Sequence, residues 1–255
     1  MLEITDYRRS LERSRASRAR RAKPSTFWAH GREWDLYADV FAPTDSPSTD
    51  MALGMLGLTG PGAAPTGSLL EIGCGAGVIA VMAALAGCDR VVASDINAAA
   101  ARNAMANATR HKVAGRFHAV QSDLFAALPL GERFDTIFWS SNYVMAPEGY
   151  VYEHIHERAY VDPGYDAHRR FLAQAPSWLN PGGRVLLHFS SRGDLASLSR
   201  LAEETGRSLR TVRSARVDDW GNPVEHMLIE ITPLDPARGA LDPSARAGQP
   251  EGKQL

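Results

Sequence analysis

The chain has 255 residues, of which 44% are hydrophobic and 22% are charged, and its formal net charge is −1. This length is typical of one α/β domain with a short extension, and the near-neutral charge excludes a long-range field that attracts nucleic acid or an anionic membrane. The two cysteines, Cys74 and Cys88, are too few for a disulfide framework, and no apolar run approaches the ~18 residues of a membrane span. We expect a cytoplasmic protein in a reducing compartment.

Residues 1–23 are predicted to form a basic N-terminal helix with a solvated surface. Acidic residues dilute its charge, and its apolar set is thin. A basic run without interleaved aromatic residues is more often a charged face than a nucleic-acid arm, so nucleic acid is disfavoured as a partner. The basic residues are Arg8, Arg9, Arg13, Arg15, Arg18, Arg20, Arg21 and Lys23.

Residues 24–66 are predicted to cover the substrate and the cofactor. The stretch from Phe27 to Phe41 is dense in aromatic side chains and should pack on another part of the chain. Polar residues at 45–48 are typical helix caps and precede an apolar-periodic helix at about 49–58. A run rich in Pro, Gly and Ala then leads into the first long strand.

Strands and helices alternate through residues 67–233, which indicates a doubly wound α/β domain with a parallel sheet. The turn at 220–223 predicts a C-terminal antiparallel hairpin, and the composition of 234–255 predicts a disordered tail. The expected strands lie at 68–73, 90–95, 116–121, 134–140, 184–190, 208–217 and 224–232, and the expected helices at 77–86, 97–110, 165–179 and 194–206.

Closely spaced glycines interrupt the apolar segment 69–77, which reads Leu-Leu-Glu-Ile-Gly-Cys-Gly-Ala-Gly. Glycine lacks a Cβ, so it can take a positive φ and let a ligand approach the backbone at a helix start. Asp95 ends the next strand 18 residues after Gly77, where an α/β nucleotide-binding fold places the acid that binds ribose. A pyrophosphate cofactor is disfavoured because the third glycine of G-x-G-x-x-G and the lysine of G-x-x-x-x-G-K-[ST] are both missing.

Three motifs in this order resemble those of class I S-adenosylmethionine (SAM) methyltransferases: Glu71-x-Gly73-x-Gly75-x-Gly77, Asp95, and the segment Gln121-Ser122-Asp123-Leu124-Phe125. The resemblance implies a mostly parallel seven-stranded sheet, with SAM as cofactor. It also implies that the glycine loop lies at the amino-acid end of SAM, that Asp95 binds the ribose and that Asp123 receives the adenine amino group. The cofactor-binding residues expected in this way are Glu71, Gly73, Gly75, Gly77, Asp95, Ile96, Asp123, Leu124 and Ser140.

Residues 30–232 resemble more narrowly the HemK/PrmC-like branch, whose members methylate amide or other planar nitrogens. The resemblance rests on the segments 40–43, 134–137 and 178–184. That branch has Asn-Pro-Pro-Tyr after its fourth strand, whereas the chain has Ser140-Ser141-Asn142-Tyr143. The prolines that fix the loop are absent and the N-terminal segment is short, so we expect a small molecule or a short peptide as substrate.

Asn142 and Tyr143 are the expected catalytic residues because they end the fourth strand and face the crevice. Methyl transfer mainly requires that donor carbon and acceptor atom be held in line at ~3 Å with water excluded. Asn142 can hold an acceptor N–H or hydroxyl, and the Tyr143 ring can face the sulfonium with a cation–π energy of ~0.5–2 kcal/mol. Trp139, within the strand, is expected in the core.

Ser48, Asp50 and Tyr165 are the expected substrate residues. Ser48 and Asp50 match the place where related enzymes bring an N-terminal segment over SAM, although an N-cap role alone would explain Ser48. Tyr165 ends the long connection 144–165, and such a loop is commonly a lid or a substrate wall. The segment 153–157 contains His-x-His, but no further ligand is at metal-binding spacing, so we expect no metal and a solvated loop.

Three functions are compatible with these residues. The leading one is methyl transfer from SAM to a nitrogen or oxygen of a small metabolite or peptide. The second is cyclisation of SAM itself, which would give methylthioadenosine and azetidine-2-carboxylate. The third is a SAM-binding module without catalysis, and the sequence leaves the oligomeric state open.

Overall fold

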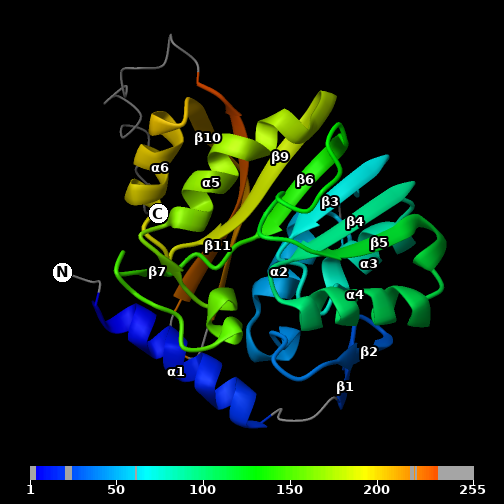
Figure 1. Cartoon of the computed structure of the whole chain (residues 1–255), viewed down its shortest axis with the longest axis horizontal. Helices are drawn as coiled ribbons and strands as arrows, with labels where there is room; N and C mark the ends of the chain where they lie inside the picture. The colour runs from blue at the N-terminus through cyan, green and yellow to red at the C-terminus, as the bar shows by residue number, and fades with distance from the viewer. Residues whose placement is uncertain (1–3, 21–24, 61, 219–220, 222, 235–255) are drawn as a thin grey trace, which may run out of the picture.

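The computed structural model describes residues 4–20, 25–60, 62–218, 221 and 223–234 (Figure 1). Its helices are α1 (Ile4–Arg20), α2 (Ser48–Met55), α3 (Val78–Leu85), α4 (Ala98–Arg110), α5 (Asp166–Gln174) and α6 (Leu195–Glu204), with short 3₁₀ helices η1 (Pro43–Asp45), η2 (Ala114–Arg116), η3 (Ile155–Ala159) and η4 (Ala175–Trp178). Its strands are β1 (Ser25–Ala29), β2 (Arg32–Leu36), β3 (Ser68–Ile72), β4 (Arg90–Asp95), β5 (Phe117–Gln121), β6 (Phe134–Ser140), β7 (Met145–Ala146), β8 (Asp162–Pro163), β9 (Leu179–Ser190), β10 (Arg207–Asp218) and β11 (Pro223–Pro233).

Seven strands form one sheet in the order β10-β11-β9-β6-β3-β4-β5. The four pairs from β9 to β5 are parallel, while β11 runs antiparallel to both β9 and β10. The expected doubly wound, mostly parallel seven-stranded sheet with its C-terminal antiparallel hairpin is therefore confirmed.

Side chains that alternate along each strand build two separate cores, one on each face of the sheet. Leu69 and Phe138 belong to the core under α2, α3 and α4. Their neighbours Leu70 and Ile137 point to the other face and belong to the core with α5 and α6. Because both faces are covered, these strands carry continuous apolar runs, which explains why they were predicted well from sequence.

The chain leaves β3 in one direction toward β4 and β5 and then returns to the other side of β3 to add β6. Two neighbouring strands whose crossovers lead away from each other leave a crevice beyond their carboxyl ends. The glycine loop after β3, Asp95 at the end of β4 and the segment 140–143 after β6 all open at this edge. The topology thus brings the three predicted motifs together.

The aromatic N-terminal stretch forms the β1–β2 hairpin, which packs on α4. Trp34 is fully buried, whereas Trp28 is 71% exposed. Asn107 of α4 accepts a hydrogen bond from the Asp35 N–H at 2.8 Å and donates to the Ala76 carbonyl at 2.8 Å. Asn103, one turn earlier, accepts from the Tyr37 N–H at 2.8 Å. Two buried amides therefore tie the hairpin and the glycine loop to one helix.

Helix α1 departs from the expectation of a solvated helix. Ser10, Ser14 and Ser17 are almost completely buried, and Leu11 joins the core with α5 and α6. The serines recur at helical spacing, so they form one narrow polar face on which the helix packs against η3. The prediction was wrong because small polar side chains carry no hydrophobic signal, although they permit close packing.

Several element boundaries also differ from the sequence-based ones. The expected helix 165–179 ends at Gln174 and continues as η4, where Pro176 lacks the N–H that a longer α-helix requires. Strand β9 begins at Leu179, five residues earlier than expected. No helix in the described ranges has the length and apolar character needed to cross a bilayer. Residues 235–255 of the predicted tail 234–255 lie outside the described residues, and the division of the chain at 23, 66 and 233 stays a prediction.

Candidate active site

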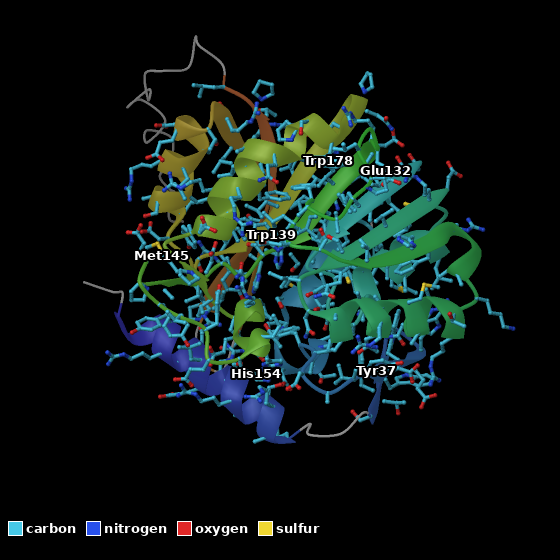
Figure 2. The ribbon with its side chains drawn as sticks, viewed as in Figure 1. Tyr37, Glu132, Trp139, Met145, His154 and Trp178 are labelled. Atoms are coloured by element: carbon cyan, nitrogen blue, oxygen red, sulfur yellow. The ribbon has the colours of Figure 1, made fainter. Side chains whose placement is uncertain are left out.

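A cavity opens beyond the carboxyl ends of β3, β4 and β6 and is lined by residues from the glycine loop, from α1 and from η3. Trp139 of β6 lies near the middle of the molecule (Figure 2) and forms part of the cavity wall. Its indole also packs against the tilted rings of His168 and Phe171, with ring centroids 4.6 and 5.0 Å away. Trp139 therefore belongs to the core, as expected, and also forms part of the cavity wall.

The glycine loop holds its shape through positive φ angles and a bond to the neighbouring strand. Gly73 and Gly75 have φ values of 64° and 53°, and both line the cavity. A Cβ on Gly75 would meet no atom within 4 Å, whereas one on Gly73 would lie 3.2 Å from the Trp139 Nε1. The Gly75 N–H donates to the Asp95 Oδ2 at 2.9 Å. The loop therefore leaves open space beside its backbone.

Gly77 lies where two helices pack together and not at the expected cofactor contact. It is absent from the cavity wall, and a Cβ at this position would lie 2.6 Å from the Cβ of Ala104 in α4. Its φ of 79° also favours glycine. Gly77 is therefore required for the packing of α3 against α4, and the structure does not place it at the ligand.

Glu71 lies on the cavity wall but is only 2% exposed. Its Oε2 accepts a hydrogen bond from the Ala80 N–H in the first turn of α3 at 2.8 Å. Burial raises the pKa of this carboxyl group well above its ordinary value, and the Asp95 carboxylate adds to that rise. Glu71 thus links β3 to α3 beneath the glycine loop.

Asp95 ends β4 and faces the cavity together with Ile96. Its Oδ1 accepts from the Asn97 N–H at 2.8 Å, and its Oδ2 accepts from Gly75. Burial raises the pKa of Asp95, while these two backbone N–H groups lower it. The carboxylate therefore has a fixed orientation, and each oxygen keeps a second lone pair for a ligand hydroxyl.

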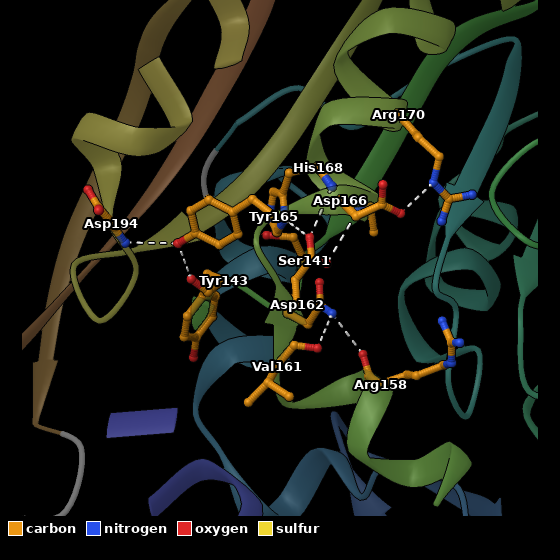
Figure 3. Close-up of polar contacts among 12 residues, drawn as sticks. Ser141, Tyr143, Arg158, Val161, Asp162, Tyr165, Asp166, His168, Arg170 and Asp194 are labelled. Carbon is orange, nitrogen blue, oxygen red and sulfur yellow. Dashed lines mark hydrogen bonds and ion pairs between the residues drawn. The ribbon is translucent and has the colours of Figure 1, made fainter. Parts of the chain in front are cut away.

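Asp123 and Leu124 follow β5 and line the cavity, as expected. The Arg170 guanidinium forms two hydrogen bonds to Asp123, at 2.9 and 3.2 Å, and a third to Asp166 at 2.9 Å. Figure 3 shows Arg170 beside Asp166. A partner on α5 thus holds Asp123, and the sequence motifs gave no indication of this pairing.

Ser140, also on the cavity wall, begins a chain of polar side chains that enters the sheet. Its Oγ lies 3.0 Å from the His188 Nδ1, and the His188 Nε2 lies 3.0 Å from the His226 Nδ1. Both imidazoles are buried and stack with centroids 5.0 Å apart. Burial, followed by the proximity of His226, lowers the pKa of His188 to about 3, so this ring is uncharged at neutral pH and fixes the Ser140 hydroxyl.

Asn142 is held by the loop that follows it. Its Nδ2 donates to the backbone carbonyls of Arg158 and Val161 at 2.9 and 2.8 Å, as the dashed lines to these two residues show in Figure 3. Two carbonyl partners fix which end of the amide is nitrogen. The Oδ1 is buried and has no hydrogen-bond partner within the described residues. Because Asn142 lines the cavity, this oxygen is a candidate acceptor for a ligand N–H or O–H.

Tyr143 lines the cavity, but Tyr165 does not. The Tyr165 ring is fully buried, and its hydroxyl is bonded to the Tyr143 carbonyl and the Asp194 N–H. The expected substrate contact of Tyr165 is therefore wrong, because its side chain lies behind the cavity wall.

Only one of the two expected substrate residues near α2 reaches the cavity. Ser48 lines it and is the first residue of α2, while Pro47 occupies the N-cap position, so the N-cap explanation of Ser48 is wrong. Asp50 is absent from the wall and pairs with the His30 Nε2 at 3.0 Å.

The segment 153–157 belongs to a packed structure and not to a solvated loop. His156 bonds the Ser14 hydroxyl of α1 at 2.8 Å, and Glu157 accepts from the Tyr150 hydroxyl at 2.8 Å. Both residues are almost completely buried. In the part of the chain that the structure describes, no cluster of His, Cys, Asp and Glu could hold a metal ion.

Sequence reasoning missed the residues that line the cavity on the side opposite the glycine loop. They come from α1, from η3 and from the segments between strands, and they include Ser10, Arg13, Phe41, Tyr152, Arg158 and Arg192. The regular spacing of Ser10, Ser14 and Ser17 was the available signal that α1 packs against the domain.

The family described as the methyltransferase small domain matches residues 53–208, which is more than half of the chain. The chain belongs to this family. The expected resemblance to class I methyltransferases is thereby confirmed, and SAM is the cofactor.

Two curated relatives are release factor glutamine methyltransferases, which confirms the resemblance to the HemK/PrmC-like branch. The one from Cereibacter sphaeroides is 35% identical over 137 residues, covering 51% of this methyltransferase chain and 49% of the relative. The one from Bordetella pertussis is 30% identical over 218 residues, covering 80% of this chain and 77% of the relative. The chain thus spans about half the length of the first relative.

Solved structures of other methyltransferases share the fold. The 16S rRNA N2 G1207 methyltransferase RsmC of T. thermophilus, in complex with AdoMet and guanosine, has a TM-score of 0.51 and 17% identity, over 84% of this chain and 50% of that chain. SMU.776, in complex with SAH, has a TM-score of 0.53 and 13% identity, over 82% of this chain and 56% of that chain. At these identities the likeness concerns the fold alone.

Proposed function

We propose that the protein transfers the methyl group of SAM to a nitrogen or oxygen of a small molecule or peptide that enters the cavity. The observation that carries this proposal is the Asn142 Oδ1, a buried oxygen on the cavity wall without a hydrogen-bond partner within the described residues. An unsatisfied buried carbonyl costs ~1–3 kcal/mol, which an acceptor N–H or O–H would recover on binding. That hydrogen bond would orient the accepting atom.

The residues around the glycine loop fit SAM. We assign the approach of its amino-acid end to Gly73 and Gly75, its ribose hydroxyls to Asp95, and its adenine to Ile96, Asp123 and Leu124. SAM supplies an activated sulfonium methyl group, so the chain has to position two atoms and exclude water. The open space beside Gly75 and the fixed Asp95 carboxylate support this assignment.

Tyr143 and Ser140 are assigned to the reacting centre because both lie on the cavity wall beside Asn142. The Tyr143 ring packs at right angles to Phe189 and His226, with both centroids 6.2 Å away, so its orientation is fixed. A fixed aromatic face can stabilise a neighbouring sulfonium by a cation–π contact of ~0.5–2 kcal/mol.

The side of the cavity opposite the glycine loop, called the acceptor side below, favours a substrate that is enclosed. Ser10 and Arg13 of α1, together with Ile155 of η3, line it. The Ser14–His156 hydrogen bond joins these two elements. The relatives are named for methylation of glutamine in a release factor. Here a helix of the same chain lines the acceptor side, so we favour a small molecule or a peptide end over a folded protein surface.

Acceptor screening tests the proposal. Purified protein is incubated with SAM carrying a trideuterated methyl group and with fractions of a small-molecule extract, and S-adenosylhomocysteine (SAH) and mass-shifted products are followed by mass spectrometry. We expect SAH and one labelled product in the same fraction, and loss of both with Asn142→Ala. A glutamine-containing peptide forms a separate arm, because a labelled peptide there would favour the reaction for which the relatives are named.

The control variant must remove an amide that plays no part in the cavity. Asn103→Ala is unsuitable because that side chain holds the hairpin. Gln174→Ala removes an exposed amide at the end of α5, outside the cavity wall, and should form both products as the wild type does.

Two results would contradict methyl transfer. Methylthioadenosine formed from SAM alone would support the cyclising alternative, which none of the relatives named above suggests. SAH binding without any product in any arm would support a module that binds SAM without turnover.

A further inference from the structure

Three arginines from three separate elements line the acceptor side of the cavity. Arg13 belongs to α1, Arg158 to η3 and Arg192 to the segment between β9 and α6. All three are partly buried. A guanidinium group presents a rigid fork of donors that matches the oxygens of a carboxylate or phosphate.

Arg158 is the best positioned of the three. Its backbone carbonyl is fixed by the Asn142 amide at 2.9 Å, and the adjacent Glu157 is buried and bonded to Tyr150. Its guanidinium carbon lies 4.3 Å from the centroid of the Tyr152 ring, which also lines the cavity. No carboxylate of the described residues forms an ion pair with Arg158. In Figure 3 its side chain extends away from Val161, toward the side of the view that holds Arg170.

Arg192 reaches helix α1 near Arg13, whose Nη2 donates to the Asp45 carbonyl at 3.2 Å. The Arg192 Nη2 donates to the Ser10 hydroxyl at 3.1 Å, and Ser10 lies about one turn before Arg13 on the same helix. Both Ser10 and Arg13 line the cavity. The packing of the serine face of α1 therefore brings a second and a third guanidinium to the cavity wall.

The cavity carboxylates whose contacts are described have partners other than Arg158. Asp123 is paired with Arg170, and Asp39 is paired with Arg18 at 3.1 Å. Glu71 and Asp95 lie at the glycine loop and accept backbone N–H groups. SAM itself carries one carboxylate, one ammonium and one sulfonium, so its binding adds a net positive charge. An anionic second ligand would complete the site.

We propose that the methyl acceptor carries an oxyanion, a carboxylate or a phosphate group, which Arg158 binds with the help of Arg13 and Arg192. This inference rests on the proposed function, because it names the class of substrate that the same cavity takes. The oxyanion would anchor one end of the acceptor on the arginines, while the Asn142 Oδ1 orients the accepting nitrogen or oxygen at the other.

Titration calorimetry tests the proposal on the full-length protein saturated with SAH. Inorganic phosphate and benzoate serve as probes, at constant ionic strength maintained with NaCl. We expect saturable one-site binding of at least one probe, weakened about tenfold or more by Arg158→Gln because a charge-assisted bidentate contact is lost. Arg158→Lys should recover only part of the affinity, since it restores the charge without the fork.

Arg169→Gln is the matched control. Arg169 is paired with Glu204 on the surface and is absent from the cavity wall, so this variant should bind both probes as the wild type does. Saturable phosphate binding would indicate a phosphorylated acceptor, and benzoate binding a carboxylate acceptor; either supports the proposal. No saturable binding of either probe, or equal weakening in Arg169→Gln, would overturn it. SAH affinity is measured first for every variant, because its absence would reject the proposed function instead.

Discussion

Tyr165 and Tyr143 are joined by a short hydrogen bond, in which the Tyr165 hydroxyl donates to the Tyr143 carbonyl at 2.6 Å (Figure 3). The same hydroxyl accepts from the Asp194 N–H at 2.8 Å. Burial raises the pKa of Tyr165, so the hydroxyl keeps its proton and remains a donor. One buried hydroxyl therefore connects the segment after β6 with the start of α6, directly behind the cavity wall.

Replacing Tyr165 by Phe should reduce stability without affecting the cofactor site. The Tyr143 carbonyl and the Asp194 N–H would lose their partner, which costs ~1–3 kcal/mol of unfolding free energy. Urea denaturation measures this loss, and calorimetry with SAH should give the wild-type affinity. Tyr37→Phe is the control, because the Tyr37 hydroxyl has no hydrogen-bond partner within the described residues and should be dispensable. Loss of SAH affinity in Tyr165→Phe would contradict the expectation that the cofactor site is unaffected.

Alanine at Gly75 and alanine at Gly77 should affect different properties of the protein. In Gly77→Ala the new Cβ would lie 2.6 Å from the Ala104 Cβ, so overpacking of ~1–3 kcal/mol adds to the strain of a positive φ, ~1–2 kcal/mol. We expect a marked drop in melting temperature. In Gly75→Ala the φ of 53° brings a similar strain, but the Cβ enters open space beside the cavity, so the loss of stability should be smaller than in Gly77→Ala and SAH binding should weaken. Equal losses of stability in both variants would argue against this division of roles.

Asp95→Asn should weaken SAH binding by about 10- to 100-fold. Hydrogen bonds to a charged group contribute ~1.5–3 kcal/mol, and each ~1.4 kcal/mol corresponds to a factor of ten. The amide oxygen can accept from only one of the two backbone N–H groups, and the NH2 group faces the other donor, so the free energy of unfolding should also fall by ~1–3 kcal/mol. Asp50→Asn, outside the cavity wall, is the control. Wild-type affinity of Asp95→Asn would show that the ribose is held elsewhere.

Stability should fall in acid because of His156. Burial lowers its pKa to about 4, below the ordinary value of ~6.5, so the unfolded chain binds a proton that the folded one rejects. Stability from this group is complete above pH ~6.5 and is lost as the pH falls toward 4; between pH 6.5 and 5 the loss is ~2 kcal/mol. Denaturation of His156→Gln at both pH values should show a smaller loss than the wild type. His118→Gln, at an exposed position, should retain the wild-type difference.

The sequence predicted that the residues assigned to the cofactor lie at one edge of the sheet, because this placement depends on local chemistry. The glycines of the loop, Asp95 and Asp123 each follow an apolar strand, and parallel strands bring their carboxyl ends to one edge. Tyr165 and Asp50 were placed incorrectly because position along the chain does not show which way a side chain points. Tyr165 faces the core and Asp50 faces His30.

The acceptor half could not be predicted, because its residues are distant in sequence and meet only through packing. Ser14 and His156 are separated by 142 residues and form a buried hydrogen bond. A serine face gives no hydrophobic period, so the sequence predicts a solvated α1, and it predicts a solvated loop for the buried segment 153–157.

The sequence by itself determined the sheet and its strand alternation, since hydrophobic periodicity is a property of short segments, and its resemblance to class I methyltransferases implied the cofactor. Only the tertiary structure decided which charges line the cavity opposite the glycine loop. Arg13, Arg158 and Arg192 belong to three elements, and their gathering at one cavity follows from the packing of α1 on η3 and the turn after β9. Packing joins residues regardless of their separation along the chain, so the character of this half of the cavity is a property of the folded molecule.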